Sequence, residues 1–393
     1  MLLVGLAACG PNQRDRDDSA GSNTPDPYPS HWSAFRRTTE AFRGTLERMV
    51  NDSDLPGAVA AFVLPDGRVG AASAGMADKE AEIPMSPESR FLAGSLGKTF
   101  VAATLLSLAA EEAVDLDANV SRYLGREPWY PDLPNGSTMT VRQLLTHTSG
   151  LPDHVNDPAF GPALLSQQVE APYLTPRELV GFLLDDEPLF APGQGWAYTD
   201  TGYVLLGLII EGVTGRGYAQ VLEDRILSRL DLPRTEIQKP RLPRLATGYL
   251  DPDNPFGLPE RIVEGGAVVL DPWVEYTGGG LVSNPQDLVR WAKALYEGAA
   301  LEGPYLDEML ASAVPTGDDG RRAYGLGVFV EETSLGKTYG HTGWFPGYNT
   351  IVAYYPDHGI AVAFQTNTDA GVALEAYRDA LASVVLRGMN LVD

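Results

Sequence analysis

The feature that most constrains the fold is the placement of strand patterns at both ends of the chain. Pro56 to Gly75 alternates apolar and small residues around a turn at Pro65-Asp66-Gly67, a pattern typical of a β-hairpin. Neither this hairpin nor a second set of strands near the C-terminus can bury an apolar face alone, so we expect both to join one sheet. The C-terminal β-rich runs are 325–331, 338–343, 349–355 and 359–366.

Most of the remaining chain carries helical spacing or loop composition. Residues 232–276 hold many prolines and few periodic signals, so we expect long loops there. The sequence therefore predicts an α+β fold, in which an antiparallel sheet of N- and C-terminal strands is flanked by helices and carries a large, mainly helical insertion at about 115–275. One domain is expected over 31–393, with no internal repeats. The expected helices are 31–50, 95–112, 176–185, 217–230, 285–298 (capped by Ser283 or Asn284) and 370–388.

The N-terminus reads MLLVGLAACG, and its Cys9 is the single cysteine of the chain. The run ending Leu6-Ala7-Ala8-Cys9-Gly10 resembles the lipobox of bacterial lipoproteins, in which the cysteine carries diacylglycerol. We expect lipidation at Cys9, a flexible polar tether over the rest of residues 1–30, and an exported protein at the cell envelope or periplasm. The apolar run is short and no Lys or Arg precedes it, so this signal looks truncated and the translation start is expected upstream. The alternative is an ordinary N-terminus with a chance cysteine.

Composition and spacing exclude several classes of partner. The formal charge of −23 argues against nucleic-acid binding, which needs clustered Lys and Arg. The five histidines show no H-x-H or H-E-x-x-H spacing, so no metal is expected. No P-loop or dinucleotide motif lies in a strand-to-helix setting, so no cofactor is expected either. No segment reaches 18 uninterrupted apolar residues, which leaves a lipid anchor as the expected membrane attachment.

Ser95 and Lys98 lie three residues apart inside the small, apolar run from Phe91 to Ala103. Residues at this spacing share one face of a helix, so the hydroxyl and the ammonium are expected side by side. A charge in such a run is costly to bury without a partner. Lysine is also scarce in this chain, with five among 29 basic residues. The pair therefore indicates chemistry, although S-x-x-K alone is a common pattern.

Two later motifs can be weighed with this pair. Tyr198-Thr199-Asp200 precedes an apolar helical run, and a tyrosine beside a lysine can take a proton from a serine. Alone, Tyr198 is better explained as a core tyrosine with a satisfied hydroxyl. His341-Thr342-Gly343-Trp344 lies on an expected strand, where a glycine permits close approach of a backbone or ligand. Alone, His341 is better explained by a structural hydrogen bond.

In this order the three motifs resemble those of the serine β-lactamase and DD-peptidase family, especially its class C β-lactamase and D-alanyl-D-alanine carboxypeptidase branch. That family carries S-x-x-K, then Y-x-N, then K-T-G or H-T-G. The resemblance covers roughly residues 40–370, and the combination is far more specific than any one motif. Further similar blocks are LLTHTSGLPDH (144–154), PGQGWAYTDTGYVLLGLIIE (192–211), GGGLVSNPQDLVRW (278–291) and GHTGWFPGYNT (340–350).

The resemblance implies a serine hydrolase that forms an acyl-enzyme on Ser95. It implies that Lys98 and Tyr198 share the general-base work and that the backbone N–H groups of Ser95 and Trp344 form the oxyanion hole. It also implies that the substrate contacts Asp200, His341, Thr342 and Gly343. Small-molecule or peptide substrates follow, namely a peptidoglycan stem, an ester or a β-lactam.

Two departures from the family pattern affect the expected activity. Asp200 stands where the family usually has Asn, and an ionised carboxylate accepts hydrogen bonds but donates none. It could pair with Lys98 and hold it cationic, or select a substrate with an amine near the scissile bond. His341 replaces the lysine of K-T-G and would anchor a substrate carboxylate less firmly. We therefore expect peptidase, carboxypeptidase or esterase activity in preference to β-lactam hydrolysis.

Two other classes stay open. Ala93-Gly94-Ser95-Leu96-Gly97 is close to the G-x-S-x-G of α/β-hydrolases, but no βαβ alternation surrounds it. A non-catalytic lipoprotein that binds peptidoglycan stems is the other alternative. Nothing in the sequence indicates an oligomeric state.

Overall fold

The computed structural model describes residues 30–166, 174–301, 304–317 and 320–390. Within these ranges, nine antiparallel strands form the main sheet in the order β3-β2-β1-β14-β13-β12-β11-β10-β9. They are β1 (Gly57–Val63), β2 (Val69–Asp78), β3 (Ile83–Pro84), β9 (Val314–Pro315), β10 (Arg322–Tyr324), β11 (Phe329–Thr333), β12 (Gly336–Phe345), β13 (Tyr348–Tyr355) and β14 (Ile360–Thr366).

The N-terminal hairpin and the C-terminal strands meet in this sheet, as the sequence predicts. β1 pairs with β14 so that Ala60 lies opposite Phe364, although about 300 residues of chain separate them. The α+β architecture is therefore confirmed. A second, three-stranded sheet and a small hairpin lie beside it. They consist of β4 (Phe91–Leu92), β8 (Leu281–Ser283) and β5 (Glu236–Ile237), and of β6 (Val263–Glu264) with β7 (Ala267–Val268).

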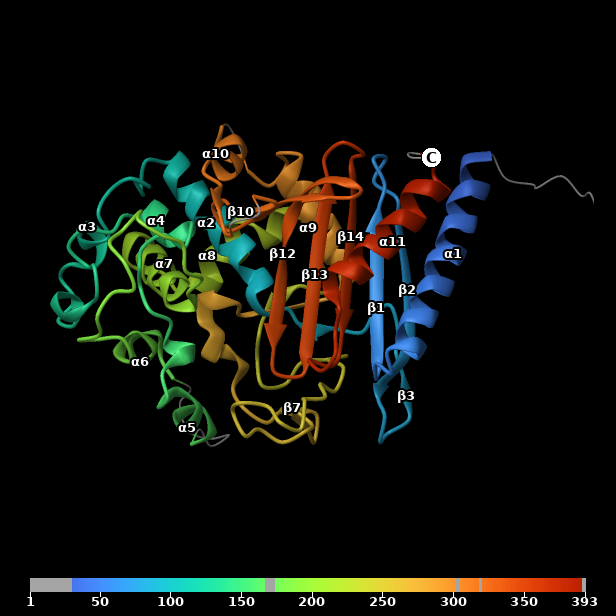
Figure 1. The fold of residues 1–393 in the computed structure, drawn as a ribbon, viewed down its shortest axis with the longest axis horizontal. Coiled ribbons are helices and arrows are strands. Elements are labelled where there is room, and N and C mark those ends of the chain that lie inside the picture. The colour runs from blue at the N-terminus through green and yellow to red at the C-terminus, as the bar shows by residue number, and fades with distance from the viewer. Residues whose placement is uncertain (1–29, 167–173, 302–303, 318–319, 391–393) are drawn as a thin grey trace, which may run out of the picture.

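Two terminal helices, α1 (Ser30–Asp52) and α11 (Leu374–Gly388), pack against one face of the main sheet and against each other (Figure 1). The apolar spacing of α1 explains its docking, because Phe42 and Leu46 lie on one helical face and are fully buried. The Phe42 ring lies 5.0 Å from that of Phe62 on β1, edge to face. Burial of such a side chain contributes roughly 1.5–3 kcal/mol.

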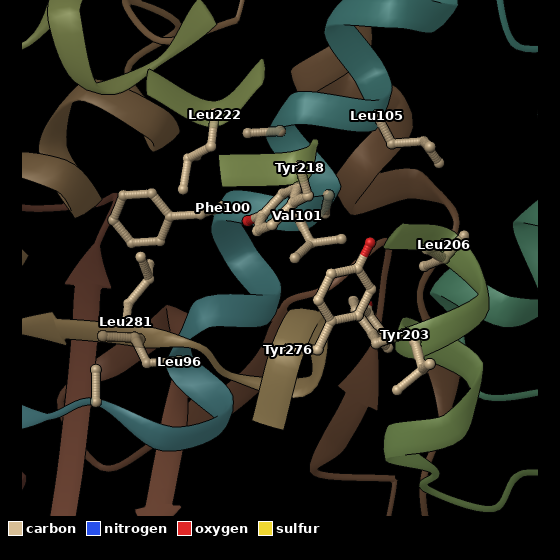
Figure 2. Packing of buried hydrophobic residues seen from close by; sticks show 14 of the residues in the cluster. Leu96, Phe100, Val101, Leu105, Tyr203, Leu206, Tyr218, Leu222, Tyr276 and Leu281 are labelled. Atoms are coloured by element: carbon tan, nitrogen blue, oxygen red, sulfur yellow. The ribbon is translucent and has the colours of Figure 1, made fainter. Parts of the chain in front are cut away.

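The opposite face of the sheet carries α9 (Pro285–Tyr296), and α2 (Gly97–Ala110) lies beyond it toward the helical region. Asn284 caps α9 by accepting a hydrogen bond from the Asp287 N–H, as expected. The Phe100 ring of α2 stacks on Trp291 of α9 with centroids 3.9 Å apart. Figure 2 shows the other side of α2, where Val101 and Leu105 pack near Tyr203 and Leu206. This packing fixes the helix that begins at the predicted nucleophile.

The middle of the chain is mainly helical, as expected, and lies to the side of the sheet away from α1 (Figure 1). Several expected boundaries shift. The expected helix 217–230 is interrupted at Ile226, whose ψ of −65° and φ of −121° depart from helical values. The helices outside the sheet faces are α3 (Ser121–Leu124), α4 (Val141–Leu145), α5 (Phe160–Leu165), α6 (Pro176–Gly181), α7 (Asp200–Thr214), α8 (Tyr218–Arg225) and α10 (Tyr305–Ala311).

One expected strand is wrong. The run 325–331 is not a single strand, because Gly327 has a φ of +77° and turns the chain between β10 and β11. Residues 232–276 are long connections with a few short strands, as predicted. The predicted lipidation site Cys9 and tether lie outside the described residues. Within the described ranges, no helix combines the length and apolar character needed to span a membrane.

Candidate active site

A tight turn presents Ser95 at the start of α2. The chain enters a 3₁₀ turn (Gly94–Leu96) through Gly94, whose φ is +55°. A Cβ at Gly94 would lie 2.4 Å from the backbone oxygen of Trp344, and one at Gly97 would lie 1.8 Å from the Gly279 oxygen. Neither position tolerates a side chain. The two glycines therefore allow the turn to pack closely between β12 and the segment before β8. The expected helix at 95–112 thus begins as a 3₁₀ turn.

Lys98 is fully buried directly behind the nucleophile. Its Nζ lies 3.0 Å from Ser95 Oγ and also donates to Asp200 Oδ1 and the Gly278 backbone oxygen. Burial by itself would lower the pKa of Lys98, but the Asp200 carboxylate outweighs it and raises that pKa above its ordinary value. Lys98 is therefore a cation at neutral pH. Asp200 is the partner that a buried charge requires.

Tyr198 lies just before α7, with its ring centroid 4.9 Å from Lys98 Nζ. Its hydroxyl is buried and interacts with the Lys98 ammonium and the Ser95 hydroxyl. Burial raises the pKa of Tyr198 to about 12, while these two neighbours oppose the shift. The His147 ring packs under the tyrosine at 4.2 Å and holds the ring in place. The hydroxyl thus lies beside both members of the Ser95-Lys98 pair.

Strand β12 runs along the turn that holds Ser95. A Cβ at Gly343 would fall 1.9 Å from the Ala93 oxygen, so only glycine allows this approach. The contact brings the Trp344 backbone beside that of Ser95, as an oxyanion hole formed by their two amides requires. β11 pairs with β12 only as far as Phe329, which lies opposite Gly340. Residues 341–345 of β12 therefore extend beyond the end of β11. Thr342, Gly343 and Ser95 line a cavity of about 350 Å³ at this edge.

His341 lines the same cavity, but as a ring held by structural hydrogen bonds. Its ring is buried, with Nε2 2.8 Å from the Tyr324 hydroxyl and Nδ1 beside the Thr342 oxygen. Burial and the charge of Lys98 lower the pKa of His341 to about 3, so the ring is neutral. Contact with an anionic substrate group through a charged His341 is therefore not supported. The same bonds show that His341 is not the base of a Ser-His-Asp triad.

A second cavity, of about 250 Å³, opens beside Ser95 and carries two acidic residues that sequence reasoning missed. Asp153 accepts hydrogen bonds from the backbone N–H of Asp200 and of Val155. Glu275 accepts from the Gln238 amide and the Gly280 N–H. Asp153 is the second-last residue of the family-like block 144–154 and could have been flagged there, whereas Glu275 lies in a region without any signal in the sequence.

Burial sets the protonation of both acids. It raises the pKa of Glu275 to about 7, with further repulsion from Asp200. Burial and Asp200 likewise raise the pKa of Asp153. The neighbouring His154 has a pKa lowered to about 4 by burial, so it supplies no positive charge at neutral pH. No group of three or more His, Cys, Asp or Glu able to hold a metal occurs in the part of the chain that the structure describes.

Comparison with solved structures agrees with this architecture. A D-stereospecific amidohydrolase from Streptomyces sp. superposes with a TM-score of 0.74 at 29% identity, covering 90% of this chain and 98% of that one. A D-amino acid amidase from Ochrobactrum anthropi SV3, complexed with L-phenylalanine amide, gives 0.73 at 29% identity with the same coverage.

Comparison at the sequence level gives the family. The chain is 28% identical over 314 residues to Penicillin-binding protein 4* of Bacillus subtilis (strain 168), covering 77% of this chain. It spans 66% of that relative's length, slightly less than two thirds. The model of the Beta-lactamase family matches residues 42–386, nearly the whole described chain. With the S-x-x-K turn, Tyr198 and the H-T-G strand converging on one site, the chain belongs to the Beta-lactamase family, a fold whose members include serine hydrolases.

Proposed function

We propose that the protein is a serine hydrolase of the amidase, peptidase or esterase type that forms an acyl-enzyme on Ser95. The observation that carries this proposal is the 3.0 Å contact between Lys98 Nζ and Ser95 Oγ, with the hydroxyl of Tyr198 interacting with both groups. The similarity to D-amino acid amidases and to a penicillin-binding protein supports the same reaction class.

The charge of Lys98 decides how the proton moves. Because Asp200 keeps Lys98 protonated, its ammonium cannot accept the proton of Ser95. Tyr198 takes that proton while it passes its own to the leaving group, so no free phenolate has to form. Lys98 stabilises the negative charge that develops on the tyrosine oxygen during this relay. Water then attacks the acyl-enzyme and the relay runs in reverse.

The charges around the site favour substrates without a carboxylate near the scissile bond. His341 is neutral, and Arg322, which lines the cavity at the edge of β12, pairs with Glu331 at 2.7 Å. The carboxylate of a β-lactam or of a C-terminal D-alanine would meet no free cation among the described residues lining this cavity. Hydrolysis of amides or esters is therefore favoured over β-lactamase and carboxypeptidase activity.

One panel of substrates on one purified sample tests the proposal. We expect turnover of short-chain p-nitrophenyl esters or amino acid amides to exceed that of nitrocefin and of D-Ala-D-Ala peptides. A fluorophosphonate should add covalently to Ser95, seen by intact mass, and Ser95→Ala should abolish both the adduct and turnover, a loss on the order of a million-fold. A folded protein with no adduct and no Ser95-dependent turnover would instead support a non-catalytic binding protein.

Lys98→Ala distinguishes this mechanism from that of an α/β-hydrolase. In the proposed mechanism, removal of the ammonium leaves Tyr198 without its stabilising charge and should cost at least a thousand-fold in kcat. A Ser-His-Asp triad would keep most of its activity in this variant.

We further propose export and lipid anchoring at Cys9, a proposal that rests on the residues Leu6-Ala7-Ala8-Cys9 alone. The expected result is partition of the protein, expressed from its full reading frame, into the detergent phase of Triton X-114. Cys9→Ser should move it to the aqueous phase, and identical partition of both forms would contradict the anchor.

A further inference from the structure

We propose that the cavity beside Ser95 binds a substrate with a free ammonium group next to an apolar side chain, so that its substrates are amides or esters of unblocked amino acids or N-terminally free peptides. This inference rests on the proposed hydrolase function and specifies its substrate class.

The cavity beside Ser95 has an excess of negative charge. Three carboxylates, from Asp153, Asp200 and Glu275, line the same cavity as Ser95. No Lys or Arg is among the described residues that line it, and the buried Lys98 behind it is already paired with Asp200. The cavity is therefore strongly negative whenever its acids are ionised.

The two additional acids, Asp153 and Glu275, have neutral hydrogen-bond partners. The hydrogen bonds to Asp153 come from backbone N–H groups, and those to Glu275 come from an amide side chain and a backbone N–H. All these donors are neutral, and His154, 3.5 Å from Asp153, is neutral as well. Buried carboxylates are costly without a counter-charge, and their raised pKa values reflect this cost. An ammonium group of the substrate would supply the missing positive charge.

The remainder of the same cavity is apolar. Aromatic rings line it next to the acidic side, with Phe160 and Phe256 centroids 6.2 Å apart and Phe256 and Trp344 5.9 Å apart. A volume of about 250 Å³ suits one amino acid side chain better than a long acyl group. The apolar lining residues are Phe160, Leu164, Phe256, Leu270, Val274 and Trp344.

Helix capping alone does not require the charge of Asp153. Its carboxylate accepts from the Asp200 N–H at the first turn of α7, but an asparagine oxygen can accept the same bond. Asp153→Asn therefore keeps the bond from the Asp200 N–H and removes the charge, with loss of the longer 3.4 Å bond from the Val155 N–H to the other oxygen, whereas Asp153→Ala removes both bonds and the charge. Glu275→Gln likewise keeps an acceptor for the Gln238 amide.

The experiment compares phenylalanine p-nitroanilide, as both enantiomers, with its N-acetyl derivative, and uses p-nitrophenyl butyrate as an ester without an amine. The wild type should favour the free amine over the N-acetyl form by at least tenfold in kcat/KM. In Asp153→Asn and Glu275→Gln, kcat/KM for the free amine relative to the butyrate should fall tenfold or more, mainly through KM. Asp287→Asn changes another buried carboxylate that accepts a backbone N–H, from Arg234, but lies outside the cavity, so this ratio should not move.

The outcomes separate this inference from the proposed function. Ser95-dependent hydrolysis of the butyrate without preference for the free amine would overturn the inference and leave the hydrolase intact. Loss in Asp153→Ala but not in Asp153→Asn or Glu275→Gln would show a structural cap and also overturn it. If Ser95 is not acylated by any probe, calorimetry of Ser95→Ala with phenylalaninamide and N-acetylphenylalaninamide still decides: tighter binding of the free amine supports the subsite, and equal binding rejects it.

Discussion

Lys98 and Asp200 form an ion pair behind the serine nucleophile, in which Nζ donates to Asp200 Oδ1 while lying 3.0 Å from Ser95 Oγ. The lysine is fully buried and the aspartate is 28% exposed at its side chain. The carboxylate thus faces the cavity on one side and fixes the charge of the lysine on the other. In the proposed mechanism, its presence in place of an asparagine shifts the role of base toward Tyr198.

Replacement of Asp200 tests this assignment. In Asp200→Asn the amide cannot neutralise the ammonium, so burial should dominate and the pKa of Lys98 should fall. A lysine that loses its proton more easily can act as base, so kcat/KM of the variant should gain an acid limb, which the wild-type relay through neutral Tyr198 does not require. Ser95-dependent ester hydrolysis from pH 5 to 10 measures this limb. An unchanged profile on every substrate would contradict the ion pair's role in catalysis.

The close approach of β12 to the serine turn gives a second prediction. Gly343→Ala would place a methyl group 1.9 Å from the Ala93 oxygen and push Trp344 away from Ser95. Loss of one oxyanion donor costs about 10² to 10³ in kcat, so a fall of at least about a hundredfold is expected. Steady-state kinetics and a melting curve of each variant measure the effect.

Gly181→Ala is the matched control, because no described atom lies within 4 Å of the position that its Cβ would occupy. It should retain wild-type kinetics. If Gly343→Ala also keeps its kcat, the amide of Trp344 is not an oxyanion donor.

The buried position of His341 predicts that a lysine cannot replace it. Lys98 and Arg322 both lower the pKa of His341, so a cation there would be repelled as well as desolvated. His341→Lys should lower the free energy of unfolding by about 3 kcal/mol or more, measured by urea denaturation. His341→Gln, which stays neutral, should cost less. A stable His341→Lys protein with increased nitrocefin hydrolysis would instead show an anion subsite at this position.

The sequence was most informative where the determinants are local. The alternation around Pro65-Asp66-Gly67 predicts the hairpin, and the cap at Asn284 predicts the start of α9, because each depends on neighbouring residues. The expected strand at 325–331 was wrong because one glycine at positive φ outweighs the β-propensity around it. The expected helix 217–230 was also wrong in its end, because Ile226 leaves helical geometry.

For the site, the order of the motifs predicted which distant residues would lie close together. It did not predict how burial and neighbouring charges would set their protonation. Burial makes His341 neutral, and no local pattern reports burial of a strand histidine next to Tyr324. Asp153 and Glu275 reach the cavity from separate segments, and Asp200 raises the pKa of both, an effect that exists only in the folded chain. Charge in a binding site is a property of the tertiary structure.

The acidic side of the cavity predicts how stability depends on pH. The pKa of Glu275 is about 7 in the folded protein, above its ordinary value of 4.5, so between these values the folded state binds more protons than the unfolded state. The stability contributed by the protonated acid is complete below pH 4.5 and is lost as the pH rises through 7. Glu275→Gln carries no charge at any pH and should be about 1–2 kcal/mol more stable than the wild type at pH 8.5, and nearly equal at pH 5.

Thermal melts of both proteins at the two pH values measure this difference, and the buried histidines cancel because both proteins contain them. Glu260→Gln, the same change at an exposed site, should leave the difference near zero at both pH values. Equal destabilisation of Glu275→Gln at pH 5 and 8.5 would mean that the bonds of Glu275 to Gln238 and Gly280 matter more than its charge. Stabilisation confined to high pH would show that the unliganded cavity carries one more negative charge than the fold can neutralise, which is the charge that an ammonium substrate would meet.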